Sequence, residues 1–192
     1  EYLLRNFIFF YWITQTLEFF IPNVKRLKLS KNVEVLSEIS LKELDLTMEA
    51  AAAEELAENF KKHKNYKVPK IYWELTTKKM LVLEFIDGIR IDDISSLKKQ
   101  NHNIDHITEI GTEVFFLQVF RDGFFHGDMH QGNLFVDPKG NIIPVDFGIM
   151  GRLDKNNRKF LAEILYGFIQ RDYVKVAEVH FQAGLVPQNA SK

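Results

Sequence analysis

The feature that most constrains this sequence is a pair of polar motifs separated by two short apolar runs. The first motif reads His126-Gly-Asp-Met-His-Gln-Gly-Asn133, and the second, Asp146-Phe-Gly148, begins thirteen residues after Asn133. The residues between them, 134–145, form two aliphatic runs around the turn Asp-Pro-Lys-Gly-Asn, which predicts a β-hairpin. Any fold assigned to the chain must accommodate both motifs and this hairpin.

The spacing matches the catalytic and metal-binding segments of protein kinases. Their catalytic loop has the form H-R-D-x-x-x-x-N and is followed across a hairpin by D-F-G; here Gly127 replaces the arginine. Phosphoryl transfer needs oxygen ligands for Mg²⁺ and a carboxylate that faces the acceptor hydroxyl. We therefore predict Asn133 and Asp146 as metal ligands. Asp128 would orient or deprotonate the nucleophile, and His130 would lie near the transferred phosphoryl group.

His126 has two interpretations. In the kinase fold a histidine at this position packs against the D-F-G segment, so we expect a structural role. The alternative is a metal site of the kind found in hydrolases, because His126, Asp128 and His130 alternate along a strand and share a face. The sequence offers no further histidine cluster to complete such a site.

The composition excludes several classes of protein. The 192 residues contain no cysteine, which removes disulfides, thiolate zinc sites and cysteine nucleophiles together. Lysine and arginine total 25 against 26 aspartate and glutamate residues, so no basic field favours nucleic acid. We expect a folded domain without a nucleic-acid partner.

The apolar patterns predict an α+β fold. Helices are expected over residues 3–21, 41–60, 105–121, 158–170 and 173–183, and β-hairpins over residues 71–86 and 134–145. Strands and helices do not alternate along the chain as they would in a doubly wound fold. The pattern therefore favours segregated helices and small antiparallel sheets.

Two segments have a second interpretation. The helix over residues 3–21 is expected to be buried or to face a partner, with membrane-surface contact as the alternative, and its apolar run is too short to span a bilayer. The basic run that follows residue 60 is expected to be a solvated helix end, with a phosphate or lipid-headgroup site as the alternative. This run comprises Lys61, Lys62, Lys64, Lys67 and Lys70.

Three longer segments separate this chain from small-molecule kinases of the aminoglycoside and choline type, which share the H-G-D-x-H-x-G-N form. These segments are 43–51 (Glu-Leu-Asp-Leu-Thr-Met-Glu-Ala-Ala), 116–128 (Phe-Leu-Gln-Val-Phe-Arg-Asp-Gly-Phe-Phe-His-Gly-Asp) and 145–151 (Val-Asp-Phe-Gly-Ile-Met-Gly). Together they closely resemble the UbiB (aarF-like) family of atypical kinases, which is linked to ubiquinone biosynthesis. The resemblance runs from about Ile21 to Pro187.

The resemblance implies a protein kinase-like two-lobe fold and further site residues. Glu43 and Asp45 match the E-x-D motif of the family, which pairs with an N-terminal K-x-G-Q segment. Glu49 matches the αC glutamate that normally pairs with a small-lobe lysine. The linker strand between the lobes would include Glu84, Phe85 and Ile86, whose backbone could bind adenine.

The resemblance also implies cofactors, partners and location. We expect ATP and Mg²⁺ as cofactors, with ubiquinone precursors or other lipids and other ubiquinone-biosynthesis proteins as partners. The expected location is a membrane surface, either the cytoplasmic face of a bacterial inner membrane or the matrix side in mitochondria. The phosphate acceptor stays open between protein, lipid, small molecule and water.

The sequence departs from the family in its N-terminal part. It has no K-x-G-Q, and because no glycine precedes Gly88 and no alanine precedes Ala50, it has neither a Gly-rich nor an Ala-rich phosphate loop. Lys25 and Lys28 lie in the wrong segment to replace the small-lobe lysine. We therefore expect an N-terminally incomplete fold, with a partial small lobe over residues 1–87 and a large lobe over 88–192.

These departures leave the activity open at this stage. Glu43, Asp45 and Glu49 would lack their intended partners. The leading hypothesis is an ATP-dependent and Mg²⁺-dependent kinase or ATPase. The alternatives are an inactive pseudokinase-type module that binds lipid or protein and, less favoured, a small-molecule phosphotransferase.

Overall fold

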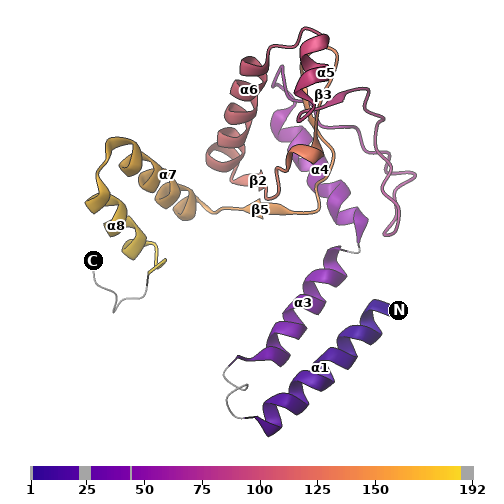
Figure 1. The fold of residues 1–192 in the computed structure, drawn as a ribbon, viewed down its shortest axis with the longest axis vertical. Coiled ribbons are helices and arrows are strands. Elements are labelled where there is room, and N and C mark those ends of the chain that lie inside the picture. Colours follow the sequence, from indigo (N-terminus) through magenta and orange to yellow (C-terminus); the bar gives the residue numbers. More distant parts are fainter. Residues whose placement is uncertain (1, 22–26, 44, 187–192) are drawn as a thin grey trace. The chain divides into compact units, whose positions relative to one another are not determined.

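The computed structural model describes residues 2–21, 27–43 and 45–186 (Figure 1). The chain divides into two compact units, one made of residues 1–51 and 72–82 and the other of residues 52–71 and 83–192. The helices are α1 (Tyr2–Phe20), α3 (Leu29–Glu43), α4 (Leu46–Phe60), α5 (Ile94–Lys99), α6 (Ile104–Phe116), α7 (Lys155–Gln170) and α8 (Tyr173–Gln182), with a π-helix over Leu117–Asp122 and a 3-10 turn over Gln131–Asn133. The strands are β1 (Ile89–Arg90), β2 (Phe124–His126), β3 (Leu134–Val136), β4 (Ile142–Pro144) and β5 (Met150–Arg152).

In the first unit, α1 and α3 run side by side in opposite directions (Figure 1). The Glu18 carboxylate of α1 accepts hydrogen bonds from the Ser30 amide at 3.0 Å and the Ser30 hydroxyl at 2.8 Å. A carboxylate in this position stabilises α3 because the amides of a first helical turn carry partial positive charge.

The predicted N-terminal helix is confirmed, but it is not buried. Large apolar side chains of α1 are solvent-exposed, including Ile8, Phe9, Phe10, Trp12, Phe19 and Phe20. None of the described helices is both long enough and apolar enough to cross a bilayer. Contact of α1 with a partner or a membrane surface stays a prediction.

The prediction of a single helix over residues 41–60 is wrong, because α3 ends at Glu43 and a separate helix, α4, begins at Leu46. Asp45 lies at the break, and its Oδ1 accepts a hydrogen bond from the Thr47 amide at 3.2 Å and another from the Thr47 hydroxyl. This is the arrangement of a helix N-cap, which favours Asp for its short acceptor side chain. The apolar spacing continues across the break, so periodicity alone could not reveal it.

The hairpin expected over residues 71–86 has no regular strands. Ile71 and Leu83 form an isolated antiparallel bridge, and Thr77 and Met80 form another. Between them the Thr76 hydroxyl donates to the Tyr72 carbonyl at 3.0 Å and accepts from the Val82 amide at 3.2 Å. The Thr76 hydroxyl thus occupies a carbonyl and an amide that would otherwise pair two strands, so the first half of the predicted hairpin folds as a turn.

The second unit contains two small antiparallel sheets. One has the strand order β1-β3-β4, and the other pairs β2 with β5. The predicted hairpin over residues 134–145 is confirmed, with Leu134 opposite Pro144 and Val136 opposite Ile142. Its buried apolar residues pack with those of α5 and α6 in a core that includes Leu97, Ile107, Ile110, Val114, Leu134, Val136, Ile142 and Ile143. Each such side chain contributes about 1.5–3 kcal/mol through burial.

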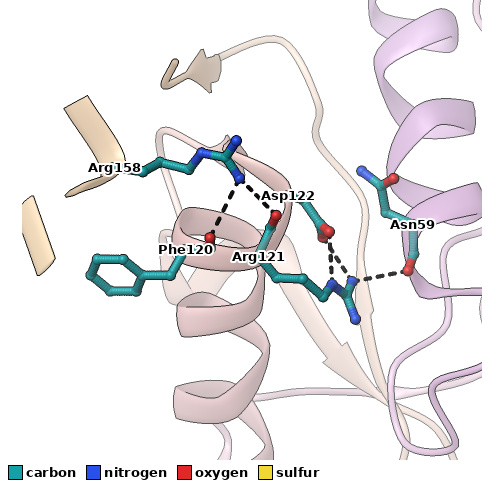
Figure 2. Close-up of polar contacts among 5 residues, drawn as sticks. All are labelled: Asn59, Phe120, Arg121, Asp122 and Arg158. Carbon is teal, nitrogen blue, oxygen red and sulfur yellow. Dashed lines mark hydrogen bonds and ion pairs between the residues drawn. The ribbon is translucent and has the colours of Figure 1, made fainter. Parts of the chain in front are cut away.

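The helix expected over residues 105–121 changes to a π-helix at Leu117 and ends at Gly123, whose φ is +64°. Figure 2 shows how the end of this wide turn is held: one Arg158 nitrogen of α7 donates to the carbonyls of Phe120 at 3.4 Å and Arg121 at 2.7 Å. The last carbonyls of a helix have no hydrogen-bond donor within the helix, so Arg158 supplies one from α7. The two predicted closing helices are confirmed as α7 and α8.

Candidate active site

The first motif forms the connection from β2 through a 3-10 turn into β3. His126 ends β2, and its Nε2 contacts the Asp146 carbonyl while its Nδ1 accepts from the Asp128 amide at 3.2 Å. Its ring centroid lies 6.4 Å from that of Phe147, and both side chains are buried. The predicted packing of His126 against the D-F-G segment is therefore confirmed.

The alternative of a metal site on His126, Asp128 and His130 is not supported. Both ring nitrogens of His126 are used in hydrogen bonds. Among the residues that the structure describes, no group of three or more histidine, aspartate or glutamate side chains is placed to hold a metal ion. A hydrolase-type centre would need such a group.

The two predicted Mg²⁺ ligands lie next to each other. Asn133 Nδ2 donates to Asp146 Oδ2 at 3.3 Å, and Asp146 Oδ1 accepts from the Gly148 amide at 3.0 Å. The hairpin causes this proximity, because Asn133 directly precedes β3 and Val145 directly follows β4, and the Val145 amide donates to the Asn133 carbonyl at 3.0 Å. Since Asn133 donates through Nδ2, its Oδ1 is the atom that could bind a cation.

Asp128 and His130 lie on the exposed loop between β2 and the 3-10 turn. The His130 amide donates to the Asp128 carbonyl at 2.7 Å. His130 Nδ1 accepts from the Gly132 amide at 3.1 Å, which caps the 3-10 turn. In the neutral imidazole this acceptor role places the proton on Nε2, the nitrogen that can donate to a phosphoryl oxygen.

Gly127, which stands where protein kinases have arginine, lies close to the strand after D-F-G. Its amide donates to the Ile149 carbonyl at 2.7 Å. A Cβ atom at Gly127 would lie 3.0 Å from Ile149 Cγ2 and 3.1 Å from Ile149 O. The close approach of these two backbones explains why a glycine fits here.

The segment predicted to bind adenine, residues 84–86, lies outside the regular helices and strands. The Glu84 amide donates to the Lys70 carbonyl at 2.8 Å, so it is not available to adenine. The Glu84 carboxylate accepts from Lys67 Nζ at 2.7 Å and from the Lys70 amide at 3.2 Å, and these bonds hold the pKa of Glu84 below its ordinary value. Phe85 is 91% exposed, and Ile86 is half-buried.

The acidic residues of the predicted E-x-D and αC motifs belong to the first unit. Asp45 has local partners in place of the absent K-x-G-Q segment: besides Thr47, its carboxylate lies 3.4 Å from Lys78 Nζ. Hydrogen bonding by Thr47 and the charge of Lys78 lower the pKa of Asp45. Glu49, in the first turn of α4, is not without an interaction partner either. The Glu43 side chain lies outside the described residues.

A cavity of about 500 Å³ lies beside the loop that carries Met129 and Gln131. Its lining is mostly apolar and comes from α5 and α6 together with Ile91, Met129, Gln131 and Leu134. Asp128, Asn133 and Asp146 do not line it. The cavity is therefore separate from the polar groups that could bind a metal-phosphate group.

One residue in the site was missed by the sequence analysis. Gln118 is fully buried in the π-helix, and its Oε1 accepts from the His126 amide at 2.9 Å. Its Nε2 lies 3.5 Å from the Tyr66 hydroxyl. The available signal was a glutamine within the apolar face of a helix, since a buried amide needs polar partners.

Comparison with known proteins identifies the family. Residues 3–180 match the ABC1 atypical kinase-like domain. The chain is 40% identical over 185 residues to a probable protein kinase UbiB from Aliivibrio fischeri, covering 94% of this chain and 34% of that protein. It is 46% identical over 149 residues to a probable protein kinase UbiB from Marinobacter nauticus, covering 76% of this chain and 27% of that protein. The chain thus spans between about a quarter and a third of the length of these curated relatives.

A solved structure shows the same fold. The Rv3197–erythromycin complex from Mycobacterium tuberculosis superposes with a TM-score of 0.63 at 22% identity, covering 93% of this chain and 46% of that chain. The predicted α+β kinase-like fold class is confirmed by this similarity and by the domain match. The chain belongs to the ABC1 atypical kinase-like family, in agreement with the resemblance of its motifs to UbiB proteins.

Proposed function

We propose that this chain carries the catalytic segment of a UbiB-type kinase or ATPase that uses ATP and Mg²⁺ in support of ubiquinone biosynthesis. The observation that carries the proposal is the contact between Asn133 Nδ2 and Asp146 Oδ2 at 3.3 Å, directly after the loop that presents Asp128. Asp128 and Asn133 lie on the connection from β2 to β3, and the hairpin brings Asp146 to Asn133. Oxygen-bearing side chains of this kind suit phosphoryl transfer, which depends on positioning and charge stabilisation.

The donor set fits Mg²⁺ rather than a softer metal. Asp146 contributes carboxylate oxygens and Asn133 an amide oxygen, and Mg²⁺ takes few protein oxygen ligands and fills its other positions with water and phosphate. When bound, the cation would neutralise the charge of the phosphates. The Gly148 amide holds Asp146 Oδ1, so the carboxylate keeps its Oδ2 directed at Asn133.

Asp128 and His130 would act on the two reacting groups. Asp128 is exposed, as a residue that meets an acceptor must be, and its carboxylate would orient or accept a proton from the attacking hydroxyl or water. His130 Nε2–H would donate to a phosphoryl oxygen, because its Nδ1 is occupied by the Gly132 amide. The acceptor itself is not specified by these groups.

Adenine would be bound by the backbone of the linker segment. The Glu84 amide is occupied by Lys70, so the Glu84 carbonyl and the backbone of Phe85 and Ile86 would make the contacts. The Lys67–Glu84 ion pair would hold the segment in place. Glu49 would contribute from α4, as the matching glutamate does in kinases.

The biological role rests on the relatives named UbiB. Ubiquinone precursors and other proteins of ubiquinone biosynthesis are the proposed partners, and the exposed apolar side chains of α1 would contact a membrane surface or such a partner. The location would be the cytoplasmic face of a bacterial inner membrane or the matrix side in mitochondria. The division into lobes near Asp87 is part of the same proposal.

Calorimetric titration of the purified chain with ATP tests the proposal. We expect weak binding that requires Mg²⁺ and falls about tenfold or more in Asp146→Asn, which removes a charged metal ligand. The matched control is Asp172→Asn, at the N-cap of α8, where the Lys175 amide is the partner. Tight binding that is unchanged without Mg²⁺ and in Asp146→Asn would contradict the proposal and favour a non-catalytic binding module.

A further inference from the structure

The C-terminal half of α4 is held to the catalytic unit by two arginines. Arg152 Nη1 donates to Glu55 Oε1 at 2.8 Å, and its Nη2 donates to Glu55 Oε2. Arg121 Nη2 donates to the Asn59 carbonyl at 2.9 Å (Figure 2). Glu55 and Asn59 are four residues apart and lie on the same face of the helix. Both arginines therefore bind the same face of α4.

Each guanidinium is also fixed from its own side. Arg152 lies over the buried ring of Phe124, 4.4 Å from its centroid, and Phe124 is its direct partner in the β2–β5 pairing. Arg121 is oriented by both carboxylate oxygens of Asp122 at 2.7 Å, as Figure 2 shows. A planar guanidinium with a two-pronged partner and a ring beneath it has little freedom to reorient.

The β2–β5 pairing leads from Arg152 directly to the catalytic residues. After Phe124 opposite Arg152, the ladder continues with His126 opposite Met150 and ends in the bond from the Gly127 amide to the Ile149 carbonyl. Asp128 is the next residue after Gly127, and Asp146 lies three residues before Ile149. One end of this small sheet thus holds α4, and the other end sets the spacing of Asp128 and Asp146.

We propose that Arg152 and Glu55 are positioning residues, which transmit the placement of α4 through the β2–β5 pairing to Asp128 and Asp146. The Arg121–Asn59 bond would serve as a second, fixed attachment of α4 beside the Arg152–Glu55 ion pair. The inference rests on the proposed phosphoryl-transfer function for its effect on turnover. The side chains of Arg152 and Glu55 are 67% and 38% exposed, so their ion pair can be broken without opening the core.

The test uses three single variants of the full chain. Glu55→Gln and Arg152→Gln remove the ion pair. Glu58→Gln is the matched control, because Glu58 is on the same helix but pairs with Lys61, the residue that directly follows α4. Hydrogen exchange measured on peptides covering 124–128 and 149–152 reports the β2–β5 pairing without nucleotide. We expect about two- to fivefold faster exchange in the first two variants, the range for loss of an exposed ion pair, and none in the control.

Turnover supplies the second readout. A positioning role predicts that Glu55→Gln and Arg152→Gln lower kcat for Mg²⁺-dependent ATP turnover about tenfold or more while KM for ATP changes little, because binding groups are intact and alignment is lost. The reversed pair Glu55→Arg with Arg152→Glu should recover part of the exchange protection and of kcat.

The outcomes separate this inference from the proposed function. Unchanged exchange in Glu55→Gln and Arg152→Gln, or an equal change in Glu58→Gln, would overturn the positioning role. Faster exchange in the two variants together with no ATP turnover by the unmodified chain would support the coupling and reject the phosphoryl-transfer function. Equal thermal midpoints of the three variants would exclude general destabilisation as the cause.

Discussion

The side-chain amide of Asn133 donates to the carboxylate of Asp146 over 3.3 Å, between the start of β3 and the end of β4. A second amide–carboxylate bond, from Asn141 Nδ2 to Asp137 Oδ2 at 2.7 Å, closes the turn at the other end of the same hairpin. The two bonds are chemically alike, yet one joins two proposed metal ligands and the other closes a turn. The Asn141–Asp137 bond can therefore serve as a control for substitutions that remove the Asn133–Asp146 bond.

Asn133→Ala should lower Mg²⁺-dependent ATP affinity about tenfold, because it removes one proposed metal ligand and the partner that orients Asp146. Its effect on stability should stay within about 1 kcal/mol, since Asn133 is half-exposed. Asn141→Ala should show the reverse: a loss of stability and unchanged nucleotide affinity. Titration calorimetry and urea unfolding of both variants measure the contrast, and equal affinities would argue against Asn133 as a ligand.

Gln118→Leu should destabilise the fold by about 1–3 kcal/mol, because it leaves the buried His126 amide without its acceptor. Tyr66→Phe should cost less than about 1 kcal/mol, since its bond to Gln118 is long at 3.5 Å. Urea unfolding measures both values, with the exposed Gln170→Leu as the control for the glutamine substitution. A Gln118→Leu variant as stable as the control would show that the His126 amide finds another acceptor.

Gly123→Ala should destabilise the protein by about 2 kcal/mol or more through two effects. Its φ of +64° disfavours a side chain, and a Cβ there would lie 2.5 Å from the Leu153 carbonyl oxygen. Gly184 has a similar φ of +69° but open space around it, so Gly184→Ala isolates the conformational cost of about 1–2 kcal/mol. Thermal unfolding of both variants should show the larger loss for Gly123→Ala; equal losses would mean that the backbone relaxes away from the contact.

Asp93 should titrate well below an ordinary aspartate. Hydrogen bonds from Ser96 and Ser95 lower the pKa of Asp93, the N-cap of α5, to about 2. The pKa of an aspartate in the unfolded chain is about 3.9, so the lower pKa in the folded state means that ionised Asp93 stabilises the fold. This stabilisation is complete above about pH 3.9 and is lost as the pH falls through about 2. Carboxyl NMR shifts give the midpoint directly.

The variant Asp93→Asn checks the sign of the Asp93 effect. Asparagine keeps an N-cap acceptor and cannot titrate. The pH dependence of stability should therefore differ between the variant and the unmodified chain only below about pH 4. A difference that persists with equal size at pH 7 and pH 3 would show that capping geometry, and not ionisation, is what Asp93 contributes.

Local patterns predicted the elements whose backbone bonds are local. The spacing of Ile107, Ile110 and Val114 identified α6, and the turn at Asp137 identified the β3–β4 hairpin. The motif spacing also predicted that Asn133 and Asp146 would act together, and the hairpin between them brings them into contact. These features depend on intervals of at most about fourteen residues.

The rest depends on interactions that spacing does not encode. The first arm of the 71–86 hairpin has strand-forming residues, but the Thr76 hydroxyl bonds the Tyr72 carbonyl and stops the ladder. The break before α4 arises from one Asp45 cap within a continuous apolar pattern. The Glu55–Arg152 ion pair joins residues 97 positions apart, and neither residue differs locally from an ordinary surface charge.

In the π-helix over Leu117–Asp122, which connects α6 to β2, the number of residues determines where the side chains point. In an α-helix, residues three apart are neighbours on one face, whereas a wider turn spreads them around the axis. Here Gln118 meets the His126 amide of β2, while Arg121 meets the Asn59 carbonyl of α4. Deleting a single residue would tighten the turn and bring both side chains back towards one face. Alignments or designed variants that gain or lose a residue at this point should therefore be treated as changes of architecture, even when every motif is kept.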